Sequence, residues 1–136
     1  MSKKVEVNEL QKVLMEYLED YEEDIFDGVK EVTDSLTKDA VNDLKQESPK
    51  STGDYARGWT KQSKKQNKNQ KYTVKIHNKT NYQLTHLLEF GHAKRNGGII
   101  KAIPHIRPIE EKYKKLYEEQ ITTTIRRRSK KWHSKI

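Results

Sequence analysis

The chain has 136 residues, of which 32% are hydrophobic and 35% are charged, so we expect a single domain with a modest core. It contains no cysteine, which excludes disulfide frameworks, thiolate catalysis and thiolate metal sites. No apolar run approaches the roughly 18 residues needed to cross a bilayer, and the first ten residues lack the apolar segment of a secretory signal. A soluble intracellular protein fits these features best.

Charge is divided unevenly along the chain. Residues 1–47 carry 6 lysines against 14 acidic residues, a net charge of −8, whereas residues 48–136 carry 22 basic against 6 acidic residues, a net charge of +16. Two explanations remain open. The basic part could contact nucleic acid, or it could contact the acidic part of a neighbouring copy in a head-to-tail assembly.

The first element is helical. Apolar residues recur at spacings of three and four from Val7 to Leu44, which is the period of an amphipathic helix. Residues 5–47 are therefore predicted to form one long helix, or two helices that meet near Gly28, where a glycine favours a kink. Ser48-Pro49 is expected to end this element.

Residues 48–105 are predicted to form a mixed core of strands and loops. Trp59–Gln62 can begin a strand, and apolar and polar residues alternate from Tyr72 to Ile76 as in a half-buried strand. The polar segment between them is expected to be a long basic hairpin tip without folded structure of its own. Its cations are candidate partner contacts: Lys64, Lys65 and Lys68.

A short helix and a second turn follow. Tyr82–Glu89 is predicted to be helical and closed by Gly91. Asn96-Gly97 favours a tight turn before a strand at Ile99–Ile103, next to the candidate contacts Lys94 and Arg95. The strands together would give a small antiparallel sheet of about three to four strands.

The last element is a second amphipathic helix. Pro108 suits a helix start, and apolar residues at helical spacing predict a helix over residues 106–128. The basic residues 129–136 are expected to fray. The fold class is therefore α+β, with a long N-terminal helix, a small sheet with a short helix, and a C-terminal helix.

Histidines near Glu89 raise the question of chemistry. His86, His92 and His105 could in principle form a metal-dependent hydrolase site with Glu89, but their spacing matches no established ligand pattern. Glu89 has no paired acid, so an ion pair with a nearby cation or a cap on backbone N–H groups explains it better. We therefore expect no catalytic residue, metal or cofactor.

Basic clusters keep a nucleic-acid interpretation open. Lysines and arginines neutralise phosphates, and Trp132 within the basic C-terminus could stack on a base. A run of cations is more often a solvated surface, so a small basic nucleic-acid-binding protein is the alternative rather than the leading interpretation.

Three short motifs occur in a fixed order. Thr52-Gly53 follows Pro49, Glu89-Phe90-Gly91 ends the segment that begins at Tyr82, and Pro104 and Pro108 flank the start of the last helix. With these motifs, residues 45–120 resemble the small tail-completion or head–tail joining proteins of long-tailed bacteriophages. The chain departs from the common pattern at Tyr55 and at Gly58-Trp59.

The resemblance implies a structural role without catalytic residues. The implied protein is a neck subunit at the head-proximal end of the tail, assembled in the host cytoplasm, that makes the tail competent to join the DNA-filled capsid. Its implied partners are the tail tube or terminator, the head connector and further copies of itself, which could close into a ring; DNA contact remains open, and no membrane is involved. Phe90 is expected to be buried, and Gly91 to supply backbone freedom.

Overall fold

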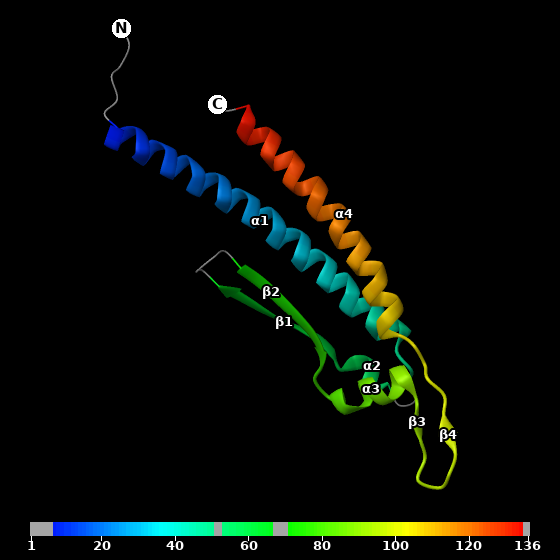
Figure 1. The fold of residues 1–136 in the computed structure, drawn as a ribbon. Helices are drawn as coiled ribbons and strands as arrows, with labels where there is room; N and C mark the ends of the chain where they lie inside the picture. Colours follow the sequence, from blue (N-terminus) through cyan, green and yellow to red (C-terminus); the bar gives the residue numbers. More distant parts are fainter. Residues whose placement is uncertain (1–6, 51–52, 67–70, 135–136) are drawn as a thin grey trace.

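The computed structural model describes residues 7–50, 53–66 and 71–134. Within them, four helices and four strands follow one another along the chain (Figure 1). Their order is α1 (Val7–Glu47), α2 (Asp54–Arg57), β1 (Trp59–Gln66), β2 (Lys71–Asn78), α3 (Tyr82–Phe90), β3 (His92–Ala93), β4 (Ile99–Ile100) and α4 (Ile106–His133). The predicted α+β class, with a long helix at each end, is confirmed.

Helix α1 runs without interruption through Gly28 and lies antiparallel to α4 (Figure 1). Of the two alternatives left by the sequence, the single helix is therefore correct. At about 1.5 Å per residue, its 41 residues span roughly 60 Å. Only part of this length is matched by α4, which has 28 residues.

Gly28 is explained by the close approach of the two long helices. A Cβ atom at this position would lie 2.8 Å from Cγ2 of Thr124 and 2.7 Å from Nε of Arg128. The Arg128 guanidinium is itself held by Asp24 at 3.0 Å and Glu31 at 3.1 Å. The glycine thus makes room for α4 instead of kinking α1.

The β1–β2 hairpin packs along α1, which lies between the hairpin and α4 (Figure 1). The strands pair antiparallel from Trp59↔Asn78 to Gln66↔Lys71. The predicted strand start at Trp59–Gln62 is confirmed, but the prediction of an unfolded tip is wrong for the segment from Ser63 to Gln66, which also belongs to β1. It forms a strand because β2 supplies a partner for its backbone hydrogen-bonding groups.

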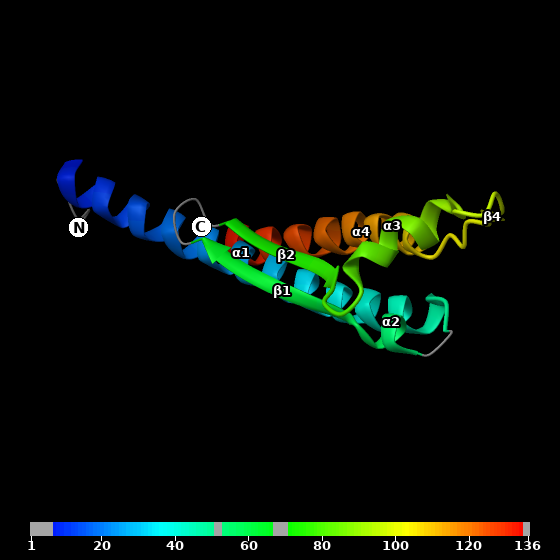
Figure 2. The same ribbon diagram turned by 90° about the horizontal axis from the view of Figure 1, so that it is seen from below.

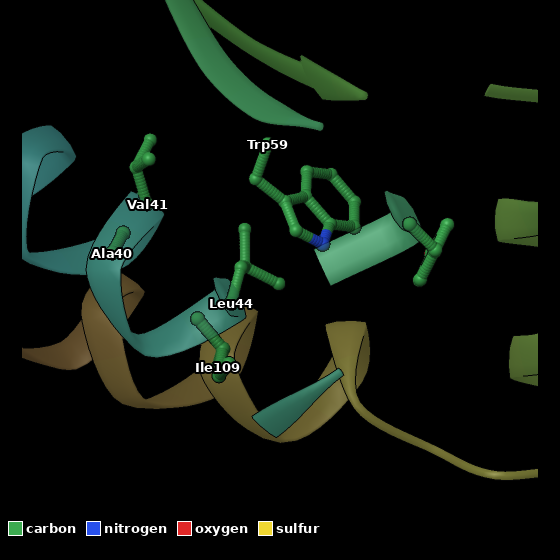
Figure 3. Close-up of a cluster of buried hydrophobic side chains, with 6 residues drawn as sticks. Ala40, Val41, Leu44, Trp59 and Ile109 are labelled. Atoms are coloured by element: carbon green, nitrogen blue, oxygen red, sulfur yellow. The ribbon is translucent and has the colours of Figure 1, made fainter. Parts of the chain in front are cut away.

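The core lies where the C-terminal half of α1, strand β1 and the start of α4 meet (Figure 3). Trp59 is 5% exposed, and its indole nitrogen donates a hydrogen bond of 2.7 Å to Ser48 Oγ at the end of α1. Each large apolar side chain buried here contributes about 1.5–3 kcal/mol. The core cluster comprises Ala40, Val41, Leu44, Tyr55, Trp59 and Ile109.

The prediction that residues 129–136 fray is wrong for the described part of this segment, because α4 continues to His133. Trp132 fixes its last turns to α1: the indole nitrogen donates to Asp24 Oδ2 at 2.8 Å, and the ring lies edge-on to Tyr17 and Tyr21. The Tyr17 hydroxyl also donates to the Trp132 carbonyl at 2.9 Å. Figure 2 shows α4 running beside α1 along this length.

The second hairpin, β3–β4, pairs His92 with Ile100 and Ala93 with Ile99. It projects from the end of the molecule opposite both termini (Figure 1). The four described strands therefore form two separate two-stranded sheets. Gly97, with φ of 90°, supplies the left-handed residue of the turn predicted at Asn96-Gly97.

Candidate functional site

We use the term hairpin end for residues 82–105, which comprise α3, the β3–β4 hairpin and the segment leading into α4. Four motif residues singled out in the sequence lie here: Glu89, Phe90, Gly91 and Pro104. Pro108 lies just beyond it, in the first turn of α4. The structure thus brings together the second and third sequence motifs.

Glu89 caps the N-terminus of α4. Its Oε2 atom accepts hydrogen bonds from the backbone N–H groups of His105 at 2.8 Å and Ile106 at 3.0 Å. Its Oε1 atom accepts from the Arg107 N–H at 2.9 Å. The backbone cap that the sequence left as one option is therefore confirmed, with a carboxylate placed at the positive end of the helix dipole.

Pro108 completes this arrangement. The first N–H groups of a helix have no acceptor within the helix, and Glu89 satisfies those of His105, Ile106 and Arg107. The next residue is a proline, which has no N–H to satisfy and whose fixed φ suits the first turn. Glu89 thus satisfies three donors, and the proline leaves no fourth donor to satisfy. Pro104 is exposed immediately before this turn.

The Glu89 carboxylate is stabilised in its charged form. Burial by itself would raise its pKa, but the three backbone N–H groups and nearby His105 outweigh burial and lower it. The side chain is 7% exposed. Its charge is thus maintained inside the protein by hydrogen bonds that also start a helix.

His105 links this cap to the core, a role that sequence reasoning missed. Its Nδ1 lies 2.7 Å from the Ile103 carbonyl and 3.2 Å from Glu89 Oε2, and its Nε2 lies 2.7 Å from the Tyr55 hydroxyl. Because a carbonyl only accepts, Nδ1 carries the proton, and in the neutral ring Nε2 accepts from Tyr55. The position of His105 between two prolines was the only available signal.

Tyr55 is held neutral by this environment. Burial, followed by the charge of Glu89, raises the pKa of its hydroxyl to about 12. Its ring also contacts Trp59 at 5.8 Å and His105 at 5.5 Å between centroids. The Glu89, His105 and Tyr55 side chains therefore use their polar atoms to join α2, α3 and α4.

Gly91 ends α3 and allows β4 to pass close by. Its φ is 76°, and a Cβ atom would lie 2.7 Å from the carbonyl oxygen of Ile100 and 2.9 Å from the Ala102 nitrogen. Both neighbours are backbone atoms that cannot move aside like a side chain. The expected backbone freedom at Gly91 is confirmed, with the further reason that no side chain fits.

Phe90 corrects the sequence-based expectation. It was expected to be buried, but it is 70% exposed, and its ring lies 5.0 Å from the His86 ring between centroids. Glu89 occupies the inward position instead. The apolar pattern of α3 predicted the wrong inward residue, because Glu89, the most polar residue of α3, faces inward to cap α4.

The first motif is only partly described, since Thr52 lies outside the described residues. Gly53 precedes α2 with φ of 87°, and its left-handed backbone begins that short helix. Asn78, which sequence reasoning also missed, is 2% exposed and donates to the Tyr55 carbonyl at 2.7 Å. Its side-chain oxygen accepts from the backbone N–H of Thr80 and Asn81, which fixes the turn before α3.

The candidate contact cations occupy two separate regions. Lys64 and Lys65 are exposed on β1, and neighbouring residues of a strand point to opposite faces. Lys65 reaches over the Phe26 ring of α1, with 5.4 Å from Nζ to the ring centroid. Lys94 and Arg95 are exposed on the β3–β4 turn. Lys68 lies outside the described residues.

Part of the charge asymmetry is satisfied within the chain, an explanation that sequence reasoning missed. Acidic α1 and basic α4 pair through Asp24 with Arg128 and through Asp43 with Lys112, at 3.0 and 2.9 Å. Trp132, a candidate for base stacking, packs against α1 instead. These contacts remove groups on which the nucleic-acid interpretation depends.

The described part of the chain contains no cluster of three His, Asp or Glu side chains placed to hold a metal ion. Among the described helices, none has the length and apolar character to cross a membrane. His86 and His105 belong to different environments, one beside exposed Phe90 and the other buried with Glu89.

Comparison with known proteins gives one family. A family model described as "Bacteriophage HK97-gp10, putative tail-component" matches residues 12–91, which is more than half of the chain. The match begins in α1, includes the β1–β2 hairpin and ends at Gly91, the residue that closes α3. No curated protein and no solved structure matches the chain. The chain therefore belongs to the HK97-gp10-like family of bacteriophage tail components.

Proposed function

We propose that the chain is a non-enzymatic tail-completion subunit that makes the phage tail competent to attach to the DNA-filled capsid. The family match supports a structural role in the tail. One observation carries the proposal. Glu89, His105 and Tyr55 form the cluster that most resembles a catalytic site, but their polar atoms bond to one another or to the backbone and hold three helices together.

The proposed location is the neck, at the head-proximal end of the tail, with assembly in the host cytoplasm. A joining subunit needs surfaces for several partners, here the tail tube or terminator, the head connector and further copies that could form a ring. Exposed Lys64 on β1, and Lys94 and Arg95 on the β3–β4 turn, offer such surfaces at two separate places. Each is a candidate contact because cations at an interface rim speed and orient docking.

A phage with a nonsense mutation in the gene for this chain tests the proposal. Electron microscopy of the lysate should show DNA-filled heads and tails that are separate from each other, and a plasmid copy of the gene should restore joined particles. Joined, infectious virions in the absence of the chain would refute the proposed role.

A substitution experiment tests the proposed contact residues. Replacing Lys94 and Arg95 together by alanine should reduce the yield of joined particles, because both side chains are exposed and their loss leaves the fold intact. The matched control replaces exposed Lys114 and Lys115 of α4 by alanine, which removes the same charge elsewhere. Equal yields from both variants would exclude the turn as a contact.

A further inference from the structure

The N-terminal part of α1 carries an apolar surface that no described element covers. Trp132, one residue before the end of α4, contacts Tyr17, so α1 extends beyond α4 over residues 7–16, or about 15 Å. Four apolar side chains in and next to this segment, which we call the exposed stripe, are each 50–59% exposed. They are Leu10, Val13, Leu14 and Leu18.

The exposed stripe continues the face of α1 that binds α4. That face contacts α4 through Tyr17, Tyr21, Asp24 and Gly28, at spacings of four, three and four residues. The same spacing leads back to Leu14 and Leu10. The surface thus has the pattern of a packed helix face without a partner, and contiguous apolar surface of this kind marks an interaction site.

A second exposed apolar surface lies at the opposite end of the molecule. Phe90 is 70% exposed, Ile99 is 81% exposed and Ile103 is 46% exposed, all within the hairpin end. Figure 1 places this end away from both termini. The hairpin end and the exposed stripe are therefore too far apart to cover each other within one copy.

Opposite charges surround the two surfaces. Residues 7–23 of α1 contain six acidic residues and one lysine, a net charge of −5. The hairpin end, residues 82–105, contains three lysines and arginines and one acidic residue, the buried Glu89, a net charge of +2. Among the described ion pairs, none involves Lys94, Arg95 or Lys101, or an acidic residue between Glu9 and Glu23.

We propose that the exposed stripe of one copy docks on the hairpin end of a second copy. This heterologous contact would bury both apolar surfaces and bring charges of opposite sign together, and repetition gives a ring or a helical series. Pairing of two α1 helices would cover the stripe equally well, but it would bring two acidic segments together. The inference rests on the proposed function in one respect: the contact between copies is the one that a tail subunit would use for assembly.

The absence of native cysteine allows a direct cross-linking test on the full-length chain. We would prepare the Leu14→Cys and Ile99→Cys variants, confirm their helix content by circular dichroism, and treat them with a bis-maleimide. The mixture of the two variants should give cross-linked dimers, whereas each variant alone should give none. A mixture of Lys115→Cys, on exposed α4 surface, with Ile99→Cys is the matched control and should give no cross-linked dimers.

Two results would overturn the inference. Dimers from Leu14→Cys alone would show that α1 pairs with α1, and no dimers from the mixture would show that the two surfaces do not meet. A different tail protein as the occupant of the stripe would produce this second result.

Charge-reversal variants test the proposed charge pairing independently. Lys94→Glu with Arg95→Glu in the Ile99→Cys chain should lower the dimer yield severalfold, and Glu9→Lys with Glu16→Lys in the Leu14→Cys chain should restore it. No recovery would exclude charge pairing at the contact. Cross-linking uses the purified chain and does not depend on phage assembly. If the chain gives the expected cross-links but phage tails join heads without it, only the proposed function is refuted. Rescue of a null phage by a chain that gives no cross-links would refute only this inference.

Discussion

At the scale of single residues, Glu89 determines how α4 begins. A buried carboxylate is costly unless its oxygens are hydrogen-bonded, and here both oxygens accept backbone N–H groups at 2.8–3.0 Å. His105 adds a link to Tyr55 and the core. The residues that most resembled a reactive site therefore hold the protein together.

Replacing Glu89 by glutamine tests this account. The amide keeps the size of the side chain but loses the charge, and it turns an N–H donor toward backbone N–H groups. We expect the free energy of unfolding to fall by about 1–3 kcal/mol. Chemical denaturation measures the change, with Glu118→Gln on the exposed surface of α4 as the control.

Equal stability of the Glu89→Gln and Glu118→Gln variants would show that the cap contributes nothing. Hydrogen exchange gives a second readout, since loss of the cap should increase exchange in the first turn of α4 more than elsewhere in that helix.

The sequence predicted the residues of the candidate site better than their orientation. Gly91 was expected to need unusual backbone freedom, and its positive φ confirms this. Phe90 was expected inside and Glu89 was left with several roles, because periodicity cannot show that a capping partner lies 16 residues further along the chain. His105 was not predicted as an anchor for the same reason: its partners, Tyr55 and Glu89, are distant in sequence.

At the scale of elements, the antiparallel contact between α1 and α4 organises the fold. Gly28 leaves room for Thr124 and Arg128 of α4, and Asp24 receives hydrogen bonds from both Arg128 and Trp132 of α4. The contact extends from Asp43 at one end to Tyr17 at the other.

Replacing Gly28 by leucine should separate these helices. The substitution gains up to about 1 kcal/mol of helix propensity, but it forces a side chain into Thr124 and Arg128, and overpacking costs about 1–3 kcal/mol. We expect a net fall in the thermal midpoint. The control is Asp27→Leu, one residue away on exposed surface, which gains propensity without the clash. A Gly28→Leu variant as stable as the control would contradict close packing at this point.

Element prediction succeeded where local pattern decides and failed where distant contacts decide. The sequence-based prediction extended α1 to its observed end at Glu47, and it placed the start of α4 at Ile106. It missed the extension of α4 to His133, which depends on contacts of Trp132 with Tyr17, Tyr21 and Asp24. It also missed the cationic half of β1, whose strand is formed by pairing with β2.

At the scale of the whole molecule, charge is arranged along the long axis. The middle of α1 is neutralised by α4, while the overhanging end stays acidic and the hairpin end stays basic. A molecule with opposite charges at its two ends is suited to head-to-tail association. A basic end could bind either nucleic acid or the acidic end of a neighbouring copy. The charge asymmetry of the sequence therefore did not distinguish these two kinds of partner.

Stability should depend on pH at both extremes. The pKa of Asp24 is lowered first by the Trp132 hydrogen bond, and Asp43 is likewise lowered by Tyr113. In Asp34 and Glu89, burial raises the pKa but hydrogen bonds outweigh it. A carboxyl with a lowered pKa stabilises the fold above its unfolded value, 3.8 for Asp or 4.5 for Glu, and loses this contribution as pH falls through the folded value.

The tyrosines act in the opposite direction. Burial and then the charge of Glu89 raise the pKa of Tyr55 from 10.0 to about 12. Its neutral form therefore contributes stability that is fully present below pH 10 and is lost as pH rises toward and through the folded pKa of about 12. We therefore expect a thermal midpoint that is nearly constant from about pH 5 to 10 and falls on both sides. Calorimetry across pH measures this, and an Asp24→Asn variant should show a shallower fall in acid. A midpoint that stays constant down to pH 3 would contradict the assigned carboxylate bonds.

The central claim is that this subunit completes the tail before it joins the head. The most direct measurement is order-of-addition complementation with heads and tails from a phage that lacks the chain. Tails incubated with purified chain, separated from the excess and then mixed with untreated heads should yield infectious particles, whereas treated heads mixed with untreated tails should not. Infectious particles formed from treated heads and untreated tails would contradict the claim.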